Sequence, residues 1–473
     1  MNIVPLRFVK LAADRFLLSD DGGRAFVSGP EFVRRYATGE LLSRDREFLV
    51  EQGFAYEHEA DLAFLGHARA LLDRFARRKQ LSYLILVPTL RCDLRCTYCQ
   101  VSRVNADQAG FDWSPEILHG VLGFIDELVT DEIQIEFQGG EPLLRVDLLE
   151  QVANYCEQRF QTARFVVCTN LSQLDDRARG FLGRDNVHIS TSLDGPAEYH
   201  QRSRTRALEM TAGFLSNLQT VVNTWGAEKV SALPTINPLD PPPVGALLDA
   251  YAQFGMRSIF LRPISHHGFA RKSYRELRDE SEAWNAYFDQ FLDEVLSVNV
   301  DAPETEMFEE YYFSQVLRRC LRSGVHNHVD LRSPNPYGED YLVVDYNGRL
   351  YPTDETRMMT RAGQIDLSVG DVWNGITERD RLDALNSEAF NSLDPDCVHC
   401  AFQPACGVDL IDDIARYGRR DIPRSATFFC RRHMHLFKRA WNLLLSDNPD
   451  HRRSLCAWLD VPYSEAAWVP VHD

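Results

Sequence analysis

Apolar and polar residues alternate at the start of the chain in short runs typical of β-strands. We expect strands at residues 6–11, 15–18 and 24–28, with the turn Asp20-Asp21-Gly22-Gly23 before the third. Pro30 then opens a helical pattern over 31–38, and further helices are predicted at 44–52 and 61–80. Residues 1–80 are therefore predicted to form a small α+β module that is winged-helix-like.

From residue 81 the pattern changes to strands that alternate with amphipathic helices. The predicted strands are 83–87, 133–137, 164–168, 187–192, 229–236 and 258–261, and the predicted helices are 114–129, 146–160, 242–254 and 276–298. Successive strand–helix units imply a parallel sheet. Six units instead of eight predict an α/β fold with an open, partial (β/α)6 TIM-type barrel over 81–300.

The alternation stops after about residue 300. Residues 341–345 and 349–351 flank Asn347-Gly348 and predict a β-hairpin. A cysteine-rich stretch runs from 394 to 430, and 430–445 has a helical pattern. We therefore expect a C-terminal extension at 301–445 and a tail at 446–473.

Composition and charge narrow the possible functions. The formal net charge is −18, which argues against sequence-independent nucleic-acid binding, because that needs clustered cations. No apolar run reaches the roughly 18 residues of a membrane span, and the first ten residues lack the features of a secretory signal. These features predict a cytoplasmic protein with no nucleic acid and no membrane as partner.

Cysteine usage points to metal chemistry. The chain has 11 cysteines, an odd number, and no export signal, so a disulfide framework is not expected. Cys92, Cys96 and Cys99 follow a predicted strand directly, and their spacing lets three thiolates converge from one tight loop. Three ligands on a four-iron cluster leave one iron open to a substrate or cofactor. A zinc site is the alternative, and it would need a fourth ligand from elsewhere.

This CxxxCxxC motif, with an aromatic residue before its last cysteine, resembles that of the radical S-adenosylmethionine (SAM) superfamily. Further matches follow later predicted strands in the expected order: Gly139-Gly140-Glu141-Pro142, Thr169-Asn170, and the stretch from Ser192 to Arg204. Each could by itself be an ordinary turn, loop exit or surface ion pair. The resemblance implies that the cysteines hold a [4Fe–4S] cluster and that SAM is bound by the Gly139–Pro142 turn, Thr169, Asn170, Ser192 at its ribose and Arg204 at its carboxylate. Gln201 departs from the family pattern, which usually has aspartate.

A second group of cysteines lies near the end of the chain. Cys397, Cys400, Cys406 and Cys430 supply four thiolates, enough for one [4Fe–4S] cluster or one zinc ion. The spacing resembles the SPASM extension of peptide-modifying radical SAM enzymes, whose full pattern has seven cysteines and two clusters. Thr353 and Leu410 stand at two of the cysteine positions, so the resemblance implies one auxiliary [4Fe–4S] cluster.

Asp354 is the candidate catalytic residue. It matches an acidic residue that accepts a proton from the substrate in sulfatase-maturing relatives, and a turn-capping aspartate is the alternative. Four cysteines stand alone in the sequence, and we expect them to be buried apolar residues: Cys156, Cys168, Cys320 and Cys456. The histidine pairs 266/267, 326/328 and 433/435 are expected to be solvated.

Over nearly its full length the chain resembles the His-Xaa-Ser system radical SAM maturase. The resemblance rests on Pro5-Leu6-Arg7-Phe8, on Gln100-Val101-Ser102-Arg103 after Cys99, and on Tyr351-Pro352-Thr353-Asp354-Glu355. It implies an enzyme that reductively cleaves SAM to a 5′-deoxyadenosyl radical. The radical then modifies a ribosomally made precursor peptide by hydrogen abstraction, giving a cross-link or a side-chain oxidation.

The same resemblance implies several partners. They are the precursor peptide, an electron donor such as flavodoxin or ferredoxin, and a second radical SAM protein of the same system. The N-terminal module would hold the peptide's leader at an exposed strand edge by β-augmentation, and a purely structural cap on the barrel is the alternative.

Three alternatives remain open. One is a formylglycine-forming sulfatase maturase, against which the departures at Thr353 and Leu410 count. The second is a non-catalytic Fe–S or zinc scaffold that binds a peptide. The third is a radical SAM enzyme that acts on a small molecule.

Overall fold

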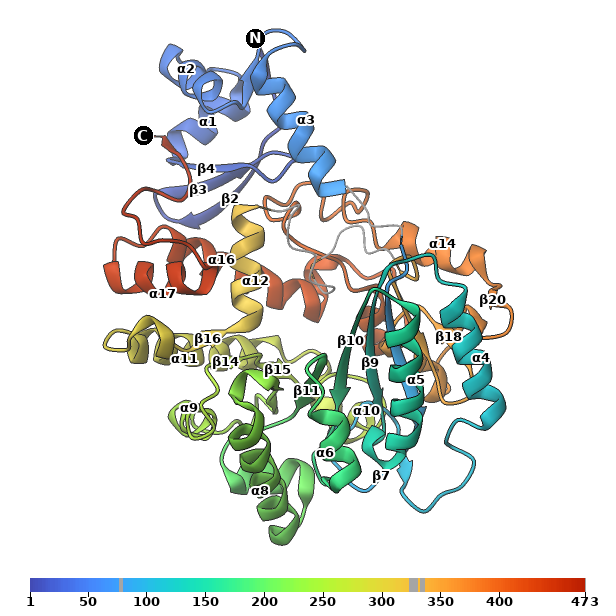
Figure 1. Cartoon of the computed structure of the whole chain (residues 1–473). Coiled ribbons are helices and arrows are strands. Elements are labelled where there is room, and N and C mark those ends of the chain that lie inside the picture. The colour runs from blue at the N-terminus through green and yellow to red at the C-terminus, as the bar shows by residue number, and fades with distance from the viewer. Residues whose placement is uncertain (76–79, 323–330, 332–336, 473) are drawn as a thin grey trace.

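The largest sheet of the molecule has nine strands and lies at the lower right in Figure 1. The computed structural model describes residues 1–75, 80–322, 331 and 337–472. Five parallel strands make one side of the sheet, in the order β12 (Val230–Ala232), β11 (Val187–Thr191), β10 (Thr162–Cys168), β9 (Glu132–Gly139) and β6 (Tyr83–Thr89). The connecting helices are α4 (Pro115–Asp126), α5 (Val146–Arg159), α6 (Asp176–Leu182), α7 (Ala197–His200) and α8 (Leu208–Trp225). The predicted α/β pattern with parallel strands is confirmed.

The fifth and sixth predicted strands behave differently from the expectation. The segment 229–236 divides at Pro234, which has no amide hydrogen to continue the ladder, into β12 and β13 (Thr235–Ile236). β13 pairs with β15 (Arg262–Pro263), and β14 (Ser258–Ile259) pairs with β16 (Glu309–Glu310). Both pairs lie outside the nine-stranded sheet, and α9 (Val244–Ala252) lies between β13 and β14 in sequence.

The C-terminal extension continues the same sheet. β17 (Tyr341–Val344) and β18 (Arg349–Tyr351) form the predicted hairpin, with Gly348 at φ +79° in its turn. β17 also pairs in parallel with β6, and β19 (Gly370–Asp371) and β20 (Gly375–Ile376) follow β18 to complete the sheet. Two helices follow the hairpin strands in this part, α13 (Asp354–Arg361) and α14 (Arg379–Glu388).

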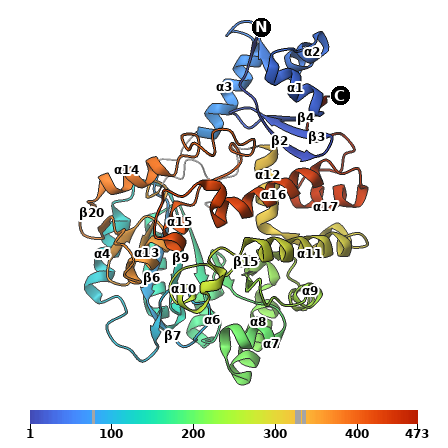
Figure 2. The same cartoon turned by 180° about the vertical axis from the view of Figure 1, so that it is seen from behind.

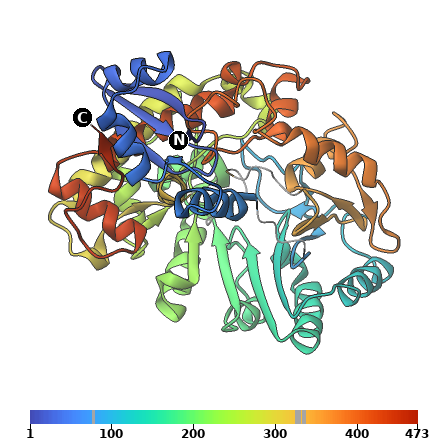
Figure 3. The ribbon, with the colours of Figure 1, turned by 90° about the horizontal axis from the view of Figure 1, so that it is seen from above.

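The strands and helices predicted for the start of the chain are present, together with two strand pairings that were not predicted. Strands β2 (Arg7–Ala12), β3 (Arg15–Ser19) and β4 (Ala25–Ser28) make an antiparallel meander. Helices α1 (Pro30–Thr38), α2 (Ser43–Glu51) and α3 (Leu62–Phe75) follow, and β1 (Asn2–Ile3) pairs with β5 (Ala55–Tyr56). Residues 76–79 of the predicted third helix lie outside the described residues. The second of these pairings joins β21 (Val471–His472) in parallel to β4 and places the C-terminal segment on the N-terminal module (Figures 1 and 3).

A group of helices lies between the module and the parallel strands (Figure 2). It comprises α11 (Ser281–Asn299), α12 (Tyr311–Leu321), α15 (Leu410–Tyr417), α16 (Phe428–Leu444) and α17 (Pro449–Leu459). The predicted helices at 276–298 and 430–445 are thus confirmed with shifted starts. Among the described residues, no helix is both long and apolar enough to cross a membrane.

Candidate functional site

Two glycines fix the loop that carries the first three cysteines. Gly139 has φ +125°, and a Cβ added there would lie 2.2 Å from the carbonyl oxygen of Thr89. A Cβ at Gly140 would lie 2.1 Å from the carbonyl oxygen of Arg91. The backbone N–H of Gly140 donates to Thr89 (3.0 Å) and that of Glu141 donates to Arg91 (2.7 Å). The glycines are therefore needed where the end of β9 touches the backbone that leads into Cys92.

Glu141 joins the ends of two neighbouring strands. Its carboxylate is fully buried and accepts hydrogen bonds from the Thr169 hydroxyl (2.8 Å) and from the backbone N–H groups of Asn170 (2.7 Å) and Leu143 (3.0 Å). Burial raises the pKa of Glu141 to about 7, although these hydrogen bonds act in the opposite direction. The carboxylate orients the β10 end, including the predicted cofactor residues Thr169 and Asn170.

Asn170 connects that strand end to the cysteine loop. Its side-chain Nδ2 lies 3.8 Å from the Cys92 Sγ and donates to Asp93 Oδ1 at 2.9 Å. The Ser172 hydroxyl donates to the other Asp93 oxygen at 2.6 Å. These contacts hold the start of the loop, so Asn170 acts here on the loop that carries the thiols.

A buried charged group supports the other side of the loop. The Tyr98 hydroxyl, just before Cys99, donates to Asp194 (2.7 Å) and accepts from Arg204 Nη1 (2.9 Å). Asp194 is fully buried and also accepts from the Ser203 hydroxyl at 2.6 Å. Burial raises the pKa of Asp194, and the charge of Arg204 partly offsets that rise. The stretch that follows β11 therefore positions Tyr98 and Arg204 relative to the cysteines.

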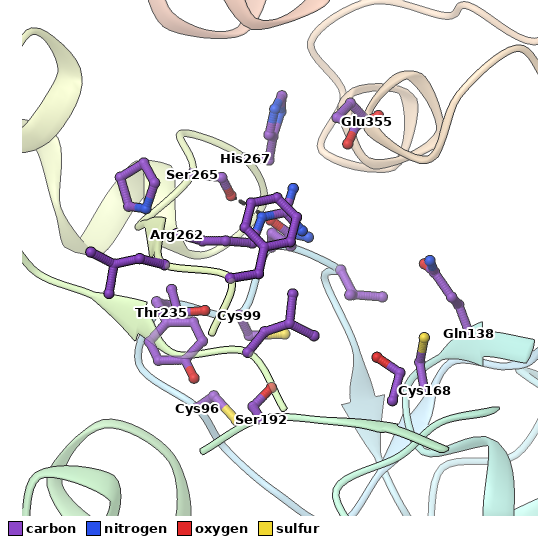
Figure 4. A pocket seen from close by; sticks show the side chains of 18 of the residues that line it. Cys96, Cys99, Gln138, Cys168, Ser192, Thr235, Arg262, Ser265, His267 and Glu355 are labelled. Carbon is purple, nitrogen blue, oxygen red and sulfur yellow. Dashed lines mark hydrogen bonds between the residues drawn. The ribbon is translucent and has the colours of Figure 1, made fainter. Parts of the chain in front are cut away.

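These elements surround one cavity of about 440 Å³. It brings together nine of the predicted site residues: Cys92, Cys96, Cys99, Gly139, Gly140, Thr169, Asn170, Ser192 and Arg204. Two others, Glu141 and Pro142, are not among the described residues that line it. In Figure 4 Cys96 and Ser192 lie at one end of the cavity, and His267 and Glu355 lie at the other.

The thiolate forms of the cysteines in this cavity would be stabilised by a bound metal. Burial raises the pKa of Cys92 and Cys96, and Arg204 partly offsets this for Cys96. Desolvated thiolates need a positively charged partner, which iron supplies. Three thiols on one loop, beside a cavity with room for a further ligand, fit a [4Fe–4S] cluster with one open iron.

Several lining residues were not identified from the sequence. Cys168 at the end of β10 is half-buried and donates from Sγ to Glu136 Oε1 at 3.1 Å, so the expectation of a buried apolar residue is wrong for this cysteine. Gln138 also lines the cavity, and its Nε2 donates to the same oxygen of Glu136 at 2.5 Å. The available signal was the alternation along β9, where polar residues 134, 136 and 138 separate the buried Ile135 and Phe137.

Asp354 lies at the first position of α13. Its carboxylate accepts a hydrogen bond from Arg357 Nε at 2.7 Å, and Arg357 is fully buried. Among the described residues that line the cavity, Glu355 is present and Asp354 is not. The catalytic role of Asp354 stays a prediction. Thr353, where the family pattern has cysteine, is the N-cap of this helix.

The four C-terminal cysteines lie close enough to affect one another's ionisation. Burial raises the pKa of Cys397, Cys400 and Cys406, and neighbouring thiols add to the rise for Cys397 and Cys406. Burial likewise raises the pKa of Cys430, on the first turn of α16, to about 11. Among the described residues, no group of three or more His, Cys, Asp or Glu is arranged to hold a single metal ion. Four thiols can serve as the donor set of a [4Fe–4S] cluster, which distributes its ligands over four irons, or of one zinc ion.

The remaining cysteines and histidines can now be compared with the expectation. Cys156, Cys320 and Cys456 are buried, as predicted. The expectation of solvated histidines is wrong for His266, His267 and His433, which are also buried. His267 lines the cavity, and its Nδ1 has no hydrogen-bond partner among the described residues. Residues 326 and 328 lie outside the described residues.

Comparison with known proteins supports this interpretation of the site. Residues 86–221 match the model of the Radical SAM superfamily. An uncharacterized protein, MJ0907, of Methanocaldococcus jannaschii is 26% identical over 24% of this chain and 39% of its own length. GTP 3′,8-cyclase of Erythrobacter litoralis is 34% identical over 32% of this chain and 45% of its own length. The chain thus spans less than half the length of these two curated relatives.

The fold of this chain is also similar to that of solved structures, over a longer part of the chain than the family model covers. Native anSMEcpe with bound AdoMet superposes with a TM-score of 0.56 at 16% identity, over 76% of this chain and 97% of that one. Native anSMEcpe with AdoMet and the Cp18Cys peptide gives a TM-score of 0.54 at 15% identity, with the same coverage of both chains. This chain therefore contains a radical SAM domain and has the radical SAM α/β fold, with a partial barrel like that of its structural neighbours.

Proposed function

We propose that this protein is a radical SAM enzyme that modifies a ribosomally made precursor peptide, of the His-Xaa-Ser type. One observation carries the proposal. The cavity with the three cysteines is lined from both sides, by the parallel strands and by Glu355, Asp409 and Phe428 of the C-terminal extension. A chamber closed by a second structural unit can hold a side chain of a larger substrate in place.

The residues of the chain fit the cofactors of this reaction. Cys92, Cys96 and Cys99 would hold a [4Fe–4S] cluster, with SAM beside Ser192 and Arg204. When bound, this pair supplies reductive cleavage of SAM and a radical that abstracts hydrogen. Phe260, Trp284 and Phe288 give the cavity an apolar wall that excludes water from the reacting atoms.

The peptide substrate is supported by the fold and by the N-terminal module. The structural neighbour anSMEcpe has been solved with a peptide, Cp18Cys, together with AdoMet. The module here has a four-stranded mixed sheet, and a sheet edge is a surface to which an extended peptide can add a strand. A flavodoxin or ferredoxin as electron donor, a second radical SAM protein as partner, and one auxiliary cluster at Cys397, Cys400, Cys406 and Cys430 belong to the same proposal.

The test begins with anaerobic reconstitution. We expect about eight irons per chain, which correspond to two [4Fe–4S] clusters. With SAM and dithionite we also expect formation of 5′-deoxyadenosine. Cys96→Ala should lose about four irons and this activity. Cys156→Ala, which changes a buried cysteine of α5, should keep both. An iron-free chain that binds zinc would refute the proposal and support the scaffold alternative.

A small anionic substrate is the second candidate function. Curated relatives of the radical SAM region are GTP 3′,8-cyclases, and Arg262 and Arg432 line the cavity. Arg432 Nε is buried and has no hydrogen-bond partner among the described residues. GTP should therefore be assayed beside candidate peptides, including a cysteine-containing sulfatase peptide. Turnover of GTP with no peptide product would favour this candidate.

A further inference from the structure

The chain's own C-terminal segment occupies one edge of the N-terminal sheet. The sheet order is β2-β3-β4-β21, so β21 covers the outer edge of β4. Val471 pairs with Val27 and His472 pairs with Ser28 in a parallel register. The Val27 N–H donates to the Pro470 carbonyl at 3.0 Å. This is the geometry in which an extended peptide adds a strand to a sheet.

The side chain of His472 fills a specific slot beside that edge. Its Nε2 lies 2.9 Å from Asp45 Oδ1, and its ring stacks on Phe48 with centroids 4.4 Å apart. Phe32 meets the same ring edge-on at 5.0 Å. The Ser28 hydroxyl donates to the His472 carbonyl at 2.8 Å. The histidine is 9% exposed, so the slot surrounds nearly all of it.

The slot is built independently of its occupant. Asp45 is fully buried and accepts two hydrogen bonds of 2.7 Å from Arg35, one on each oxygen. It also accepts from the Leu42 N–H at the start of α2. Although burial alone would raise the pKa of Asp45, these bonds and His472 hold it well below the ordinary range. A fixed carboxylate between two aromatic rings selects a side chain that is both planar and a hydrogen-bond donor.

The covering strand is short, and it lies at the edge of the sheet opposite β2. β21 has two residues, and Val471 is 56% exposed. At the opposite edge, β2 is tied to the C-terminal extension, where Arg7 Nε donates to the Val398 carbonyl at 2.6 Å. A partner strand can therefore be exchanged at β4 without separating the module from the rest of the chain.

We propose that Ser28, Phe32, Asp45 and Phe48 form a peptide-recognition slot that residues 470–472 of the chain occupy in the absence of substrate. A precursor peptide with an extended segment and a histidine in the same register displaces them. Only the identity of this peptide as substrate rests on the proposed function. The slot itself rests on the contacts of β21.

The experiment uses the tail as its own probe. A fluorescein-labelled peptide of residues 464–473 is titrated against the full chain and against a chain that ends at Val469, with fluorescence anisotropy as the readout. We expect the shortened chain to bind the probe at least tenfold more tightly, because the tethered tail competes at a high effective concentration. A probe with His472→Ala should bind the shortened chain about tenfold or more weakly, since it lacks the bond to Asp45.

A full-length His472→Ala chain provides a second measurement in case the shortened chain is unstable. It should bind the unmodified probe more tightly than the wild-type chain does. Equal weak binding by the wild-type, shortened and His472→Ala chains would overturn the proposal, as would a probe whose affinity does not depend on its histidine. Formation of 5′-deoxyadenosine by the same preparations tests the proposed function separately, because it needs Cys96 and does not involve the slot.

Discussion

Polar side chains from two neighbouring strands meet inside the cavity and are candidates for proton transfer. Glu136 accepts hydrogen bonds from Cys168, Gln138 and the hydroxyl of Tyr83. Burial, together with the negative charge of Glu136, keeps the pKa of Cys168 above its usual value, so Cys168 holds its proton there. Glu136 is a residue of strand β9, and these three hydrogen bonds fix the position of its carboxylate. It is therefore our candidate for the group that accepts a proton.

Glu136→Gln should separate substrate modification from SAM cleavage. We expect modification of the peptide to fall about 100-fold, because an amide cannot accept the proton that a carboxylate can. Uncoupled formation of 5′-deoxyadenosine should stay within about twofold of wild type. Both products can be measured by chromatography in one reaction. A parallel loss of both activities would show that Glu136 instead supports the cofactor site.

Asp354→Asn tests the catalytic role that the sequence predicts for Asp354. It keeps an oxygen that can accept from the buried Arg357, whereas alanine would leave that guanidinium without its 2.7 Å partner. Full peptide modification by Asp354→Asn would remove Asp354 from the list of catalytic residues.

At the scale of elements, side-chain caps fix the start of two helices. Thr353 caps α13 and Glu310 caps α12. Glu310 is the last residue of β16, and Thr353 follows β18 after Pro352; at both positions side-chain capping replaces backbone partners that the helix start lacks. Capping gives a physical reason for threonine at position 353, where the resemblance led us to expect cysteine.

Thr353→Ala should lower the free energy of unfolding by about 1 kcal/mol. Thr353 and Thr356 exchange two hydrogen bonds of 3.1 Å between side chain and backbone, and alanine removes the one accepted by Thr353 Oγ1. Denaturant titration followed by circular dichroism measures the change. Thr353→Ser keeps the hydroxyl and serves as control. An equal loss in both variants would mean that the methyl group, and not the cap, stabilises this helix.

Glu310 predicts a pH dependence of stability. Burial raises its pKa from 4.5 to about 8, although the backbone N–H groups of Phe313 and Leu261 oppose the rise. Between these two pH values the folded chain keeps a proton that the unfolded chain releases, so stability falls as pH rises through this window. The free energy of unfolding of the wild-type protein should therefore fall across this window by about 3–5 kcal/mol more than that of Glu310→Gln. Denaturant titrations of both proteins at pH 5, 6.5 and 8 test this, and identical slopes would contradict it.

At the scale of the whole molecule, the C-terminal cysteine segment contacts the N-terminal module. The Ser19 hydroxyl of β3 donates to the Ala401 carbonyl at 2.7 Å, and Arg7 of β2 donates to Val398. Both acceptors lie between Cys397 and Cys406. If the cysteine segment has a fixed conformation, these two hydrogen bonds help to fix the sheet that we propose for peptide recognition.

Removing the auxiliary cluster that we propose at these cysteines should loosen the module. With Cys430→Ala, we expect about four fewer irons and faster amide hydrogen exchange in β2 and β3. Exchange in β9 and β10 of the parallel sheet should be unchanged. Cys456→Ala, in α17, is the control because that buried cysteine stands outside both cysteine groups. Unchanged exchange in β2 and β3 after loss of iron would show that the contacts with Val398 and Ala401 persist without the metal.

The sequence determined the elements whose signals are local. Strand alternation, helix caps such as Ser114 and the turn at Gly348 depend on neighbours within a few residues, and these features match the structure. The order of the motifs on successive strands was also sufficient to collect Cys92, Cys96, Cys99, Ser192 and Arg204 at one cavity, because parallel strands end at a common edge.

Only the tertiary structure decided the pairings and contacts between residues far apart in sequence. β17 joins β6, β21 joins β4, and Cys168, Glu136 and His267 turn towards the cavity. A short strand has many possible edges, and its own residues do not encode which one it meets. That choice follows from burial and hydrogen bonding of the whole chain, and it places His472 beside Asp45, 427 positions away.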